Sequence, residues 1–182
     1  MSSAGASSLP DNLPSLPVGV DLKLLFLSEI PWPPPPDYQP DLNGKCATAK
    51  QGPHEPIEVA PLGSDPHLQQ TWRFENADER KQYYIRPALD GSGLGFHNEM
   101  DTSPGIPLTL SDPSVFMVPV IYETPEGDLI AIIQPRDTYT MIPTASKFYV
   151  TVSQHNDTIE VKDIDVTLPN SPVPAWLITT RK

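Results

Sequence analysis

The chain of 182 residues lacks the features that mark several common classes of protein. It has one cysteine, Cys46, so an internal disulfide is excluded. Lys and Arg number 12 against 23 Asp and Glu, and the net charge of −11 disfavours nucleic acid or an anionic membrane as partner. No apolar run approaches the roughly 20 residues of a membrane span, and the N-terminus has no basic segment followed by an apolar one. We therefore expect no signal peptide, no transmembrane segment, and a cytoplasmic or leaderless protein.

Sequence signatures of catalysis and metal binding are missing as well. The four histidines are scattered among expected turns without the spacing of metal ligands. No G-x-S-x-G motif is present, and the glycine-rich run 91–95 is not followed by the Lys-Ser/Thr pair of a phosphate loop. A Ser-His-Asp triad assembled in space would leave no such local signature. We expect a non-enzymatic binding protein with no metal and no cofactor, in which Cys46 is a buried, small apolar residue.

Proline is abundant instead, since 24 prolines interrupt almost every window that might form a helix. Hydrophobic residues still make up 38% of the chain, which favours a folded, loop-rich, all-β protein over a disordered one. We predict a flexible Ser- and Pro-rich tail over residues 1–17 and a single domain over residues 18–182. About a dozen short strands bounded by Gly, Pro, Asn or Asp suit a barrel or a sandwich.

A recurring motif decides between a barrel and a sandwich. Residues 71–87 contain an aromatic strand, a polar turn and a second strand, and residues 120–135 repeat this pattern 48 residues later. A third aromatic strand at 175–179 closes the chain, and its matching half opens the folded part at 22–27. Repeats split between the two termini indicate a closed, symmetric architecture.

The repeats define three units at about 20–75, 76–123 and 124–182. An I-x-V or I-x-L strand, beginning at Ile57, at Ile106 and at Ile164, precedes the aromatic strand of each unit. Three four-stranded units predict a β-trefoil, a barrel capped by hairpins that leaves few exposed edges. The repeated aromatic residues are expected to fill the core; they are Trp72, Phe116, Tyr122 and Trp176.

The motifs resemble those of fungal β-trefoil proteins, which include leaderless basidiomycete protease inhibitors (mycocypin-like and serine-protease inhibitors) and ricin-B-like lectins. The resemblance lies in residues 56–62, 70–75, 84–86 and 172–176, and as a pattern it covers roughly residues 20–182. It implies a β-trefoil fold and either of two functions. The first is a protease inhibitor that occludes the protease cleft with rigid surface loops, and the alternative is a carbohydrate-binding lectin. Gln70-Thr71-Trp72 matches the Q-x-W signature of the lectins, whereas the other two units lack the Gln.

The segment between residues 30 and 45 is the first candidate for contact with a protein. Its consecutive prolines exclude it from a sheet and stiffen it as a surface loop, so docking costs little conformational entropy. Trp32 and Tyr38 supply aromatic side chains of the kind enriched in binding hot spots. The inhibitor resemblance implies that Lys45 or Arg136 enters a trypsin-like specificity pocket, or that Asn43 enters an asparagine-specific one.

The lectin alternative is centred on the glycine-rich segment at residues 90–98. Asp90, Phe96 or His97, and Asn98 offer the carboxylate, the aromatic ring and the amide that sugar recognition requires. The alternative interpretation is that this segment is a glycine-rich hairpin turn without a binding function. The partner is therefore expected to be a protease or a glycan, while the protease class and the sugar stay open.

Overall fold

The computed structural model of the chain describes residues 12–31, 33–42, 44–50, 52–65, 69–89, 91–99, 105–136, 146–165 and 171–181. Every regular element in these residues is a β-strand, which confirms the all-β prediction. Within the same ranges, no helix is long and apolar enough to cross a membrane.

Fourteen strands are found in the described part of the chain. They are β1 (Lys23–Ile30), β2 (Lys45–Thr48), β3 (Glu58–Pro61), β4 (Trp72–Asn76), β5 (Gln82–Pro87), β6 (Gly95–His97), β7 (Thr109–Ser111), β8 (Phe116–Met117), β9 (Val120–Glu123), β10 (Leu129–Ala131), β11 (Gln134–Pro135), β12 (Ser146–Val152), β13 (Ile159–Asp165) and β14 (Val173–Thr179).

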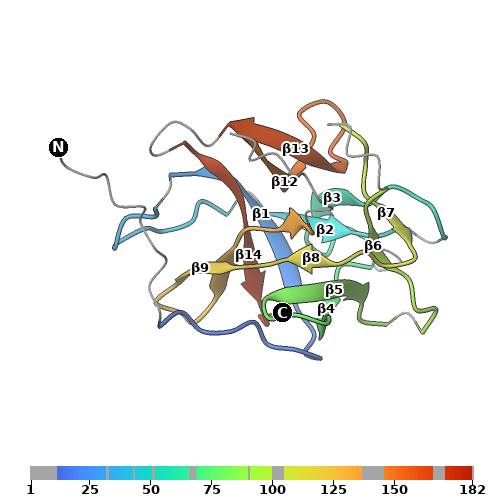
Figure 1. Cartoon of the computed structure of the whole chain (residues 1–182), viewed down its shortest axis with the longest axis horizontal. Helices are drawn as coiled ribbons and strands as arrows, with labels where there is room; N and C mark the ends of the chain where they lie inside the picture. The colour runs from blue at the N-terminus through green and yellow to red at the C-terminus, as the bar shows by residue number, and fades with distance from the viewer. Residues whose placement is uncertain are drawn as a thin grey trace.

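These strands form one six-stranded sheet, one four-stranded sheet and two isolated hairpins. The order is β3-β2-β1-β14-β10-β9 in the larger sheet and β11-β8-β5-β4 in the smaller one, and the hairpins are β12-β13 and β6-β7. Neighbouring strands are antiparallel throughout, and β1 and β14 run side by side through the middle of the molecule (Figure 1). Within the described ranges, no sheet closes into a barrel.

Two segments of the chain pass from one of the two larger sheets into the other. Residues 116–123 are divided into β8 and β9 around Pro119, which has no backbone N–H to donate to a ladder. Residues 129–135 are likewise divided into β10 and β11, with a register shift after Ile130. Leu22, just before β1, exchanges both backbone hydrogen bonds with Trp72 at 2.8 and 2.9 Å, and so ties the start of β1 to β4.

Three hairpins, β2-β3, β6-β7 and β12-β13, meet in a ring of backbone hydrogen bonds. Ile57 N donates to Leu108 O, Leu108 N donates to Ile159 O, and Ile159 N donates to Ile57 O, each at 2.8 Å. The three residues are spaced 51 apart along the chain and all are fully buried. Backbone bridges between the hairpins repeat in the same cyclic order; they are Pro56 with Thr109, Pro107 with Glu160, and Thr158 with Glu58.

This ring corrects the expected starts of two of the three strands. Leu108-Thr109-Leu110, which begins two residues after the expected Ile106, corresponds to Ile57-Glu58-Val59. In the third hairpin, Ile159-Glu160-Val161, and not Ile164-Asp165-Val166, corresponds to the same segment. The I-x-V pattern occurs at both places, so only long-range hydrogen bonding distinguishes them. Both Ile159 and Ile164 belong to the continuous strand β13, and residues 166–170 lie outside the described ranges.

The core contains the repeated aromatic residues. Trp72, Phe116 and Trp176 are fully buried, whereas Tyr122 is half-buried. The indole of Trp72 donates to Ala47 O at 2.9 Å, and the indole of Trp176 donates to Val150 O at 3.0 Å. The Trp72 indole thereby links β4 to β2, and the Trp176 indole links β14 to β12.

The segment before β1 also packs against this core. Leu16 is buried, Leu13 packs against the main core cluster, and Gly19 N donates to Phe74 O at 3.0 Å. Packed structure therefore begins before the boundary expected at residue 18. Residues 1–11 of the expected tail lie outside the described ranges.

Candidate functional site

The proline-rich segment at residues 31–44 connects β1 to β2 and projects to one side of the strands (Figure 1). Tyr38 anchors it. The Tyr38 ring packs edge-on against the Tyr122 ring of β9, with the centroids 6.2 Å apart and the planes at 86°. Tyr122 donates its hydroxyl hydrogen to Pro36 O at 3.1 Å, and Tyr38 N donates to Pro35 O at 3.0 Å. Two tyrosines thus hold a chain that proline already stiffens.

A second loop supports the end of this segment. Leu62 N donates to Gly44 O at 3.2 Å. The buried side-chain amide of Gln70 holds that second loop in place, because its Oε1 accepts from Gly63 N at 2.8 Å and its Nε2 donates to Pro61 O at 3.0 Å. Gln70 Nε2 also donates to Thr48 Oγ1 at 3.0 Å, which fixes the loop to β2. The Gln of the Q-x-W motif therefore positions a loop instead of facing a ligand.

The outer surface of the two loops is partly apolar. Leu42 is 54% exposed and Leu62 is 42% exposed, and the prolines at 33, 35 and 36 are exposed as well. Burial and the nearby Asp41 carboxylate raise the pKa of Tyr38, so its phenol stays neutral at physiological pH. The surface that faces solvent is therefore an apolar ridge edged by the exposed carboxylates of Asp37 and Asp41.

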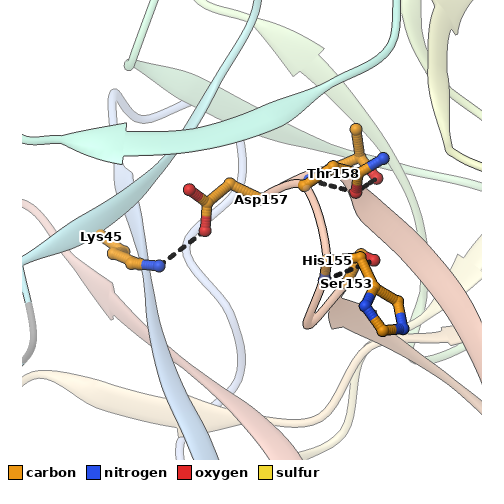
Figure 2. Close-up of polar contacts among 6 residues, drawn as sticks. Lys45, Ser153, His155, Asp157 and Thr158 are labelled. Carbon is orange, nitrogen blue, oxygen red and sulfur yellow. Dashed lines mark hydrogen bonds and ion pairs between the residues drawn. The ribbon is translucent and has the colours of Figure 1, made fainter.

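The structure separates the predicted protease-contact residues. Trp32 and Asn43 lie outside the described residues, and Tyr38 anchors the segment as described above. Lys45 opens β2, and its ammonium lies 2.6 Å from Asp157 Oδ1 in the turn between β12 and β13 (Figure 2). Arg136 is exposed just after β11, and its backbone N–H donates to Val115 O at 3.2 Å.

The turn that carries Asp157 is itself well ordered by hydrogen bonds. Asn156 Oδ1 accepts from the Thr158 hydroxyl at 2.7 Å, and His155 N donates to Ser153 Oγ at 3.3 Å. Asp157 adopts a positive φ of 57°, which an Asp tolerates in a turn. Figure 2 shows the Asp157 carboxylate directed at Lys45 and the His155 ring directed away from it. Lys45 is thus an ion-pair partner of this turn.

Among the described residues of the predicted sugar site, Phe96 cannot serve as the aromatic platform. Phe96 is fully buried, with its ring 4.8 Å from the Trp72 ring and 6.1 Å from the Phe116 ring, so it cannot stack on a sugar in solvent. His97 Nδ1 lies 2.7 Å from Asp112 O, and Asn98 N donates to Ser114 Oγ at 2.9 Å. Asp90 lies outside the described residues. The correction is physical: Phe96 completes an aromatic cluster with residues far away in sequence.

We also searched the described part of the chain for metal ligands and for a reactive thiol. No group of three or more His, Cys, Asp or Glu side chains is placed to hold a metal ion there. Burial raises the pKa of the Cys46 thiol to about 11, so it stays protonated near neutral pH and is a poor nucleophile. Its Sγ lies near the backbone oxygens of Ala47 and Gln70 within the core.

Comparison with protein families gives this all-β scaffold a functional context. The sequence profile of the clitocypin peptidase inhibitors matches residues 37–178, which is most of the chain. The protein belongs to the clitocypin peptidase inhibitor family. The match begins within the proline-rich segment and extends almost to the end of β14. A search of the curated proteins returned no match.

Membership of the clitocypin family confirms the protease-inhibitor part of the resemblance and indicates a peptidase as partner. The ricin-B part of the resemblance receives no support. Sequence reasoning missed Gln70, Tyr122 and Leu62 as residues that shape or border the loops. The Q-x-W motif drew attention to Gln70 and the repeat drew attention to Tyr122, but neither pointed to a contact with a loop.

Proposed function

We propose that this protein inhibits a peptidase by reversible steric occlusion, with the proline-rich segment 31–44 docked in or over the active-site cleft. Family membership supports a peptidase as the target. The observation that favours this segment is its anchoring by the Tyr38–Tyr122 ring pair and by the Tyr122–Pro36 hydrogen bond. A loop held in one conformation before binding loses little conformational entropy when it docks.

The exposed ridge of the segment provides the contact. Leu42 is a large apolar side chain that is more than half exposed, and burying it against a partner is favourable. The prolines beside it present apolar surface whose shape is fixed by their rings. Leu62, on the supporting loop, extends the apolar surface next to Gly44. Of the two candidate cations, Arg136 is better suited than Lys45 to enter a specificity pocket, because Lys45 is paired with Asp157.

We also propose that the sheets are parts of a β-trefoil. Three hairpins capping a barrel of six strands, in which β8 with β9 and β10 with β11 each count as one strand, would account for the cyclic hydrogen bonds of Ile57, Leu108 and Ile159. The succession of strands from β1 through β14, β10 and β9 into β8, β5 and β4, with Leu22 bonded to Trp72, is the one that such a barrel requires. Experimental determination of the structure, including residues 137–145 and 166–170, tests whether the six strands close.

The experiment that tests inhibition is a panel of serine, cysteine and asparaginyl peptidases assayed with micromolar protein. We expect inhibition of at least one class. Leu42→Asp should weaken that inhibition at least tenfold, because it places a charge at the centre of the apolar ridge. Val18→Asp is the matched control, since Val18 is similarly exposed at 42% but lies before β1. No inhibition across the panel would overturn the function, and equal inhibition by the Leu42→Asp variant would overturn the site.

Tyr122→Phe tests the anchoring of the segment. It removes only the hydroxyl that donates to Pro36 O and keeps the ring beside Tyr38. We expect a several-fold weaker inhibition, caused by faster dissociation, with almost unchanged thermal stability. Full inhibition by this variant would show that the hydrogen bond does not contribute to loop preorganisation.

A further inference from the structure

A cavity of about 460 Å³ lies between β1 and the β12-β13 hairpin, and inhibition by the proline-rich segment makes no use of it. Phe26, Ser28 and Glu29 of β1 line one side of the cavity. Gln154, Glu160 and Lys162 of the hairpin line the other side. The volume is within the range of small-molecule sites in proteins.

A β-bulge shapes the β1 side of the cavity. Phe26 pairs with Trp176 and Glu29 pairs with Pro174, so two residues of β1 stand opposite one residue of β14. Ser28, inside the bulge, has a positive φ of 66°, a conformation that residues other than glycine adopt rarely. The extra residue interrupts the alternation of the strand, so that the adjacent Ser28 and Glu29 both line the cavity. Strained bulges of this kind are frequent beside binding sites.

The polar groups of the cavity include both donors and acceptors. Lys162 Nζ lies 3.1 Å from Glu29 Oε1, so these two charges neutralise each other across the cavity. Within the described ranges, the side chains of Ser28, Gln154 and Glu160 make no hydrogen bond to the protein, and Lys162 pairs with Glu29. Phe26 and Val161 add apolar surface beside these groups. The His155 ring, on the turn shown in Figure 2, also borders the cavity.

We propose that this cavity binds a neutral, polyhydroxylated ligand of the size of a mono- or disaccharide. A ligand with a net charge would meet a like charge in the cavity, because carboxylates and an ammonium both line it. Sugar hydroxyls donate to the carboxylates of Glu29 and Glu160 and accept from Lys162 and Gln154. The apolar face of the ring packs against the carbon surface of the cavity, to which Phe26, Val152 and Val161 contribute. This site is separate from the glycine-rich segment 90–98 and does not depend on peptidase inhibition.

The test is NMR titration of the full chain with glucose, galactose, mannose, N-acetylglucosamine and lactose, each up to tens of millimolar. We expect at least one sugar to produce saturable shifts in the backbone amides of residues 26–29 and 151–162. Glu160→Gln and Gln154→Ala should weaken that binding at least fivefold, whereas Glu123→Gln, an exposed carboxylate on β9, should leave it unchanged.

The Ser28→Gly variant tests whether the Ser28 hydroxyl contacts the ligand, because this change should not lower the stability of the fold. Glycine adopts the positive φ without strain, so this variant should unfold at the same temperature or higher and still bind the sugar more weakly, because the hydroxyl is lost. The proposal is overturned if none of the five sugars shifts these amides, if the shifts map elsewhere, or if the three cavity variants bind as the unaltered chain does. Peptidase inhibition measured on the same samples should be unaffected by all of these changes.

Discussion

The hairpin ring and the proline-rich segment are built on opposite principles. In the ring, three segments spaced 51 residues apart form the same backbone hydrogen bond at the same length, with fully buried side chains. The segment at 31–44 has no counterpart of similar composition in the chain, and much of it faces solvent. The repeated part uses backbone hydrogen bonds and burial for stability, while the unrepeated part uses proline and two tyrosines for rigidity.

The difference indicates where substitutions should alter stability and where they should alter binding. Changes in the repeated part remove packing from a core shared by several strands. Changes in the described residues of the segment should leave that core intact, because Tyr38 packs instead against a second cluster that includes Leu25 and Leu177. Stability and inhibition should therefore respond to different substitutions.

The largest expected effect is on stability, from Trp176→Ala. This change removes a fully buried ring that contacts Phe26 and leaves Val150 O without its indole donor. We expect a loss of about 3–5 kcal/mol in the free energy of unfolding, measured by denaturant titration. Trp72→Phe is the milder counterpart, because it keeps a ring beside Phe96 and loses the indole N–H that donates to Ala47 O, and it should cost about 1–3 kcal/mol. A loss below about 1 kcal/mol in both variants would contradict a shared core.

The sequence alone predicts much of this scaffold. Its prolines exclude helices and its alternating strands predict an all-β protein, and both follow from local residue properties. The core placement of Trp72, Phe116 and Trp176 also follows from the repeat. The third unit was assigned to Ile164 instead of Ile159, because two I-x-V patterns are locally equivalent and only hydrogen bonds to distant strands distinguish them.

The candidate sites were less accessible to sequence reasoning. The proline-rich segment could be identified from composition, but its anchor at Tyr122 is 84 residues from Tyr38 and has no local signal. Phe96 stands among glycines and polar residues, so its burial depends on an aromatic cluster that forms only in the folded chain. No residue near Lys45 in the sequence indicates an ion pair, because its partner Asp157 lies 112 residues away.

A smaller effect on stability is expected from pH, through Cys46 at the junction of the segment and the core. Burial raises the pKa of its thiol to about 11 in the folded chain, above the ordinary value of 9.0. The unfolded chain loses this proton first, so stability is fully present below pH 9 and falls by about 2–3 kcal/mol as the pH rises towards 11. Cys46→Ala should flatten this dependence in unfolding titrations between pH 8 and pH 11.

The alkylation rate of the Cys46 thiol should distinguish substitutions in the core from substitutions in the proline-rich segment. Alkylation at pH 8 should be slow in the folded chain and in segment variants, but faster in Trp176→Ala, where the core opens more often. Rapid alkylation of the unaltered chain would show that Cys46 is not shielded as the structure describes.

The smallest expected effect comes from Lys45→Gln. The Lys45–Asp157 pair is roughly half exposed, so its loss should cost at most about 1 kcal/mol, and less at high salt. Inhibition of a trypsin-like peptidase should change less than about threefold, because the ammonium is already paired with Asp157. Arg136→Gln is the comparison variant. A loss of inhibition in Lys45→Gln alone would make Lys45 the contact residue.

The most direct measurement compares the inhibition constant and the melting temperature of the unaltered chain with those of a variant whose residues 33–42 are a Gly-Ser sequence of equal length. We propose that the segment carries binding and the strands carry stability, so inhibition should weaken at least about a hundredfold while the melting temperature changes by only a few degrees. Unchanged inhibition by a folded variant would contradict the assignment of the contact site to the proline-rich segment.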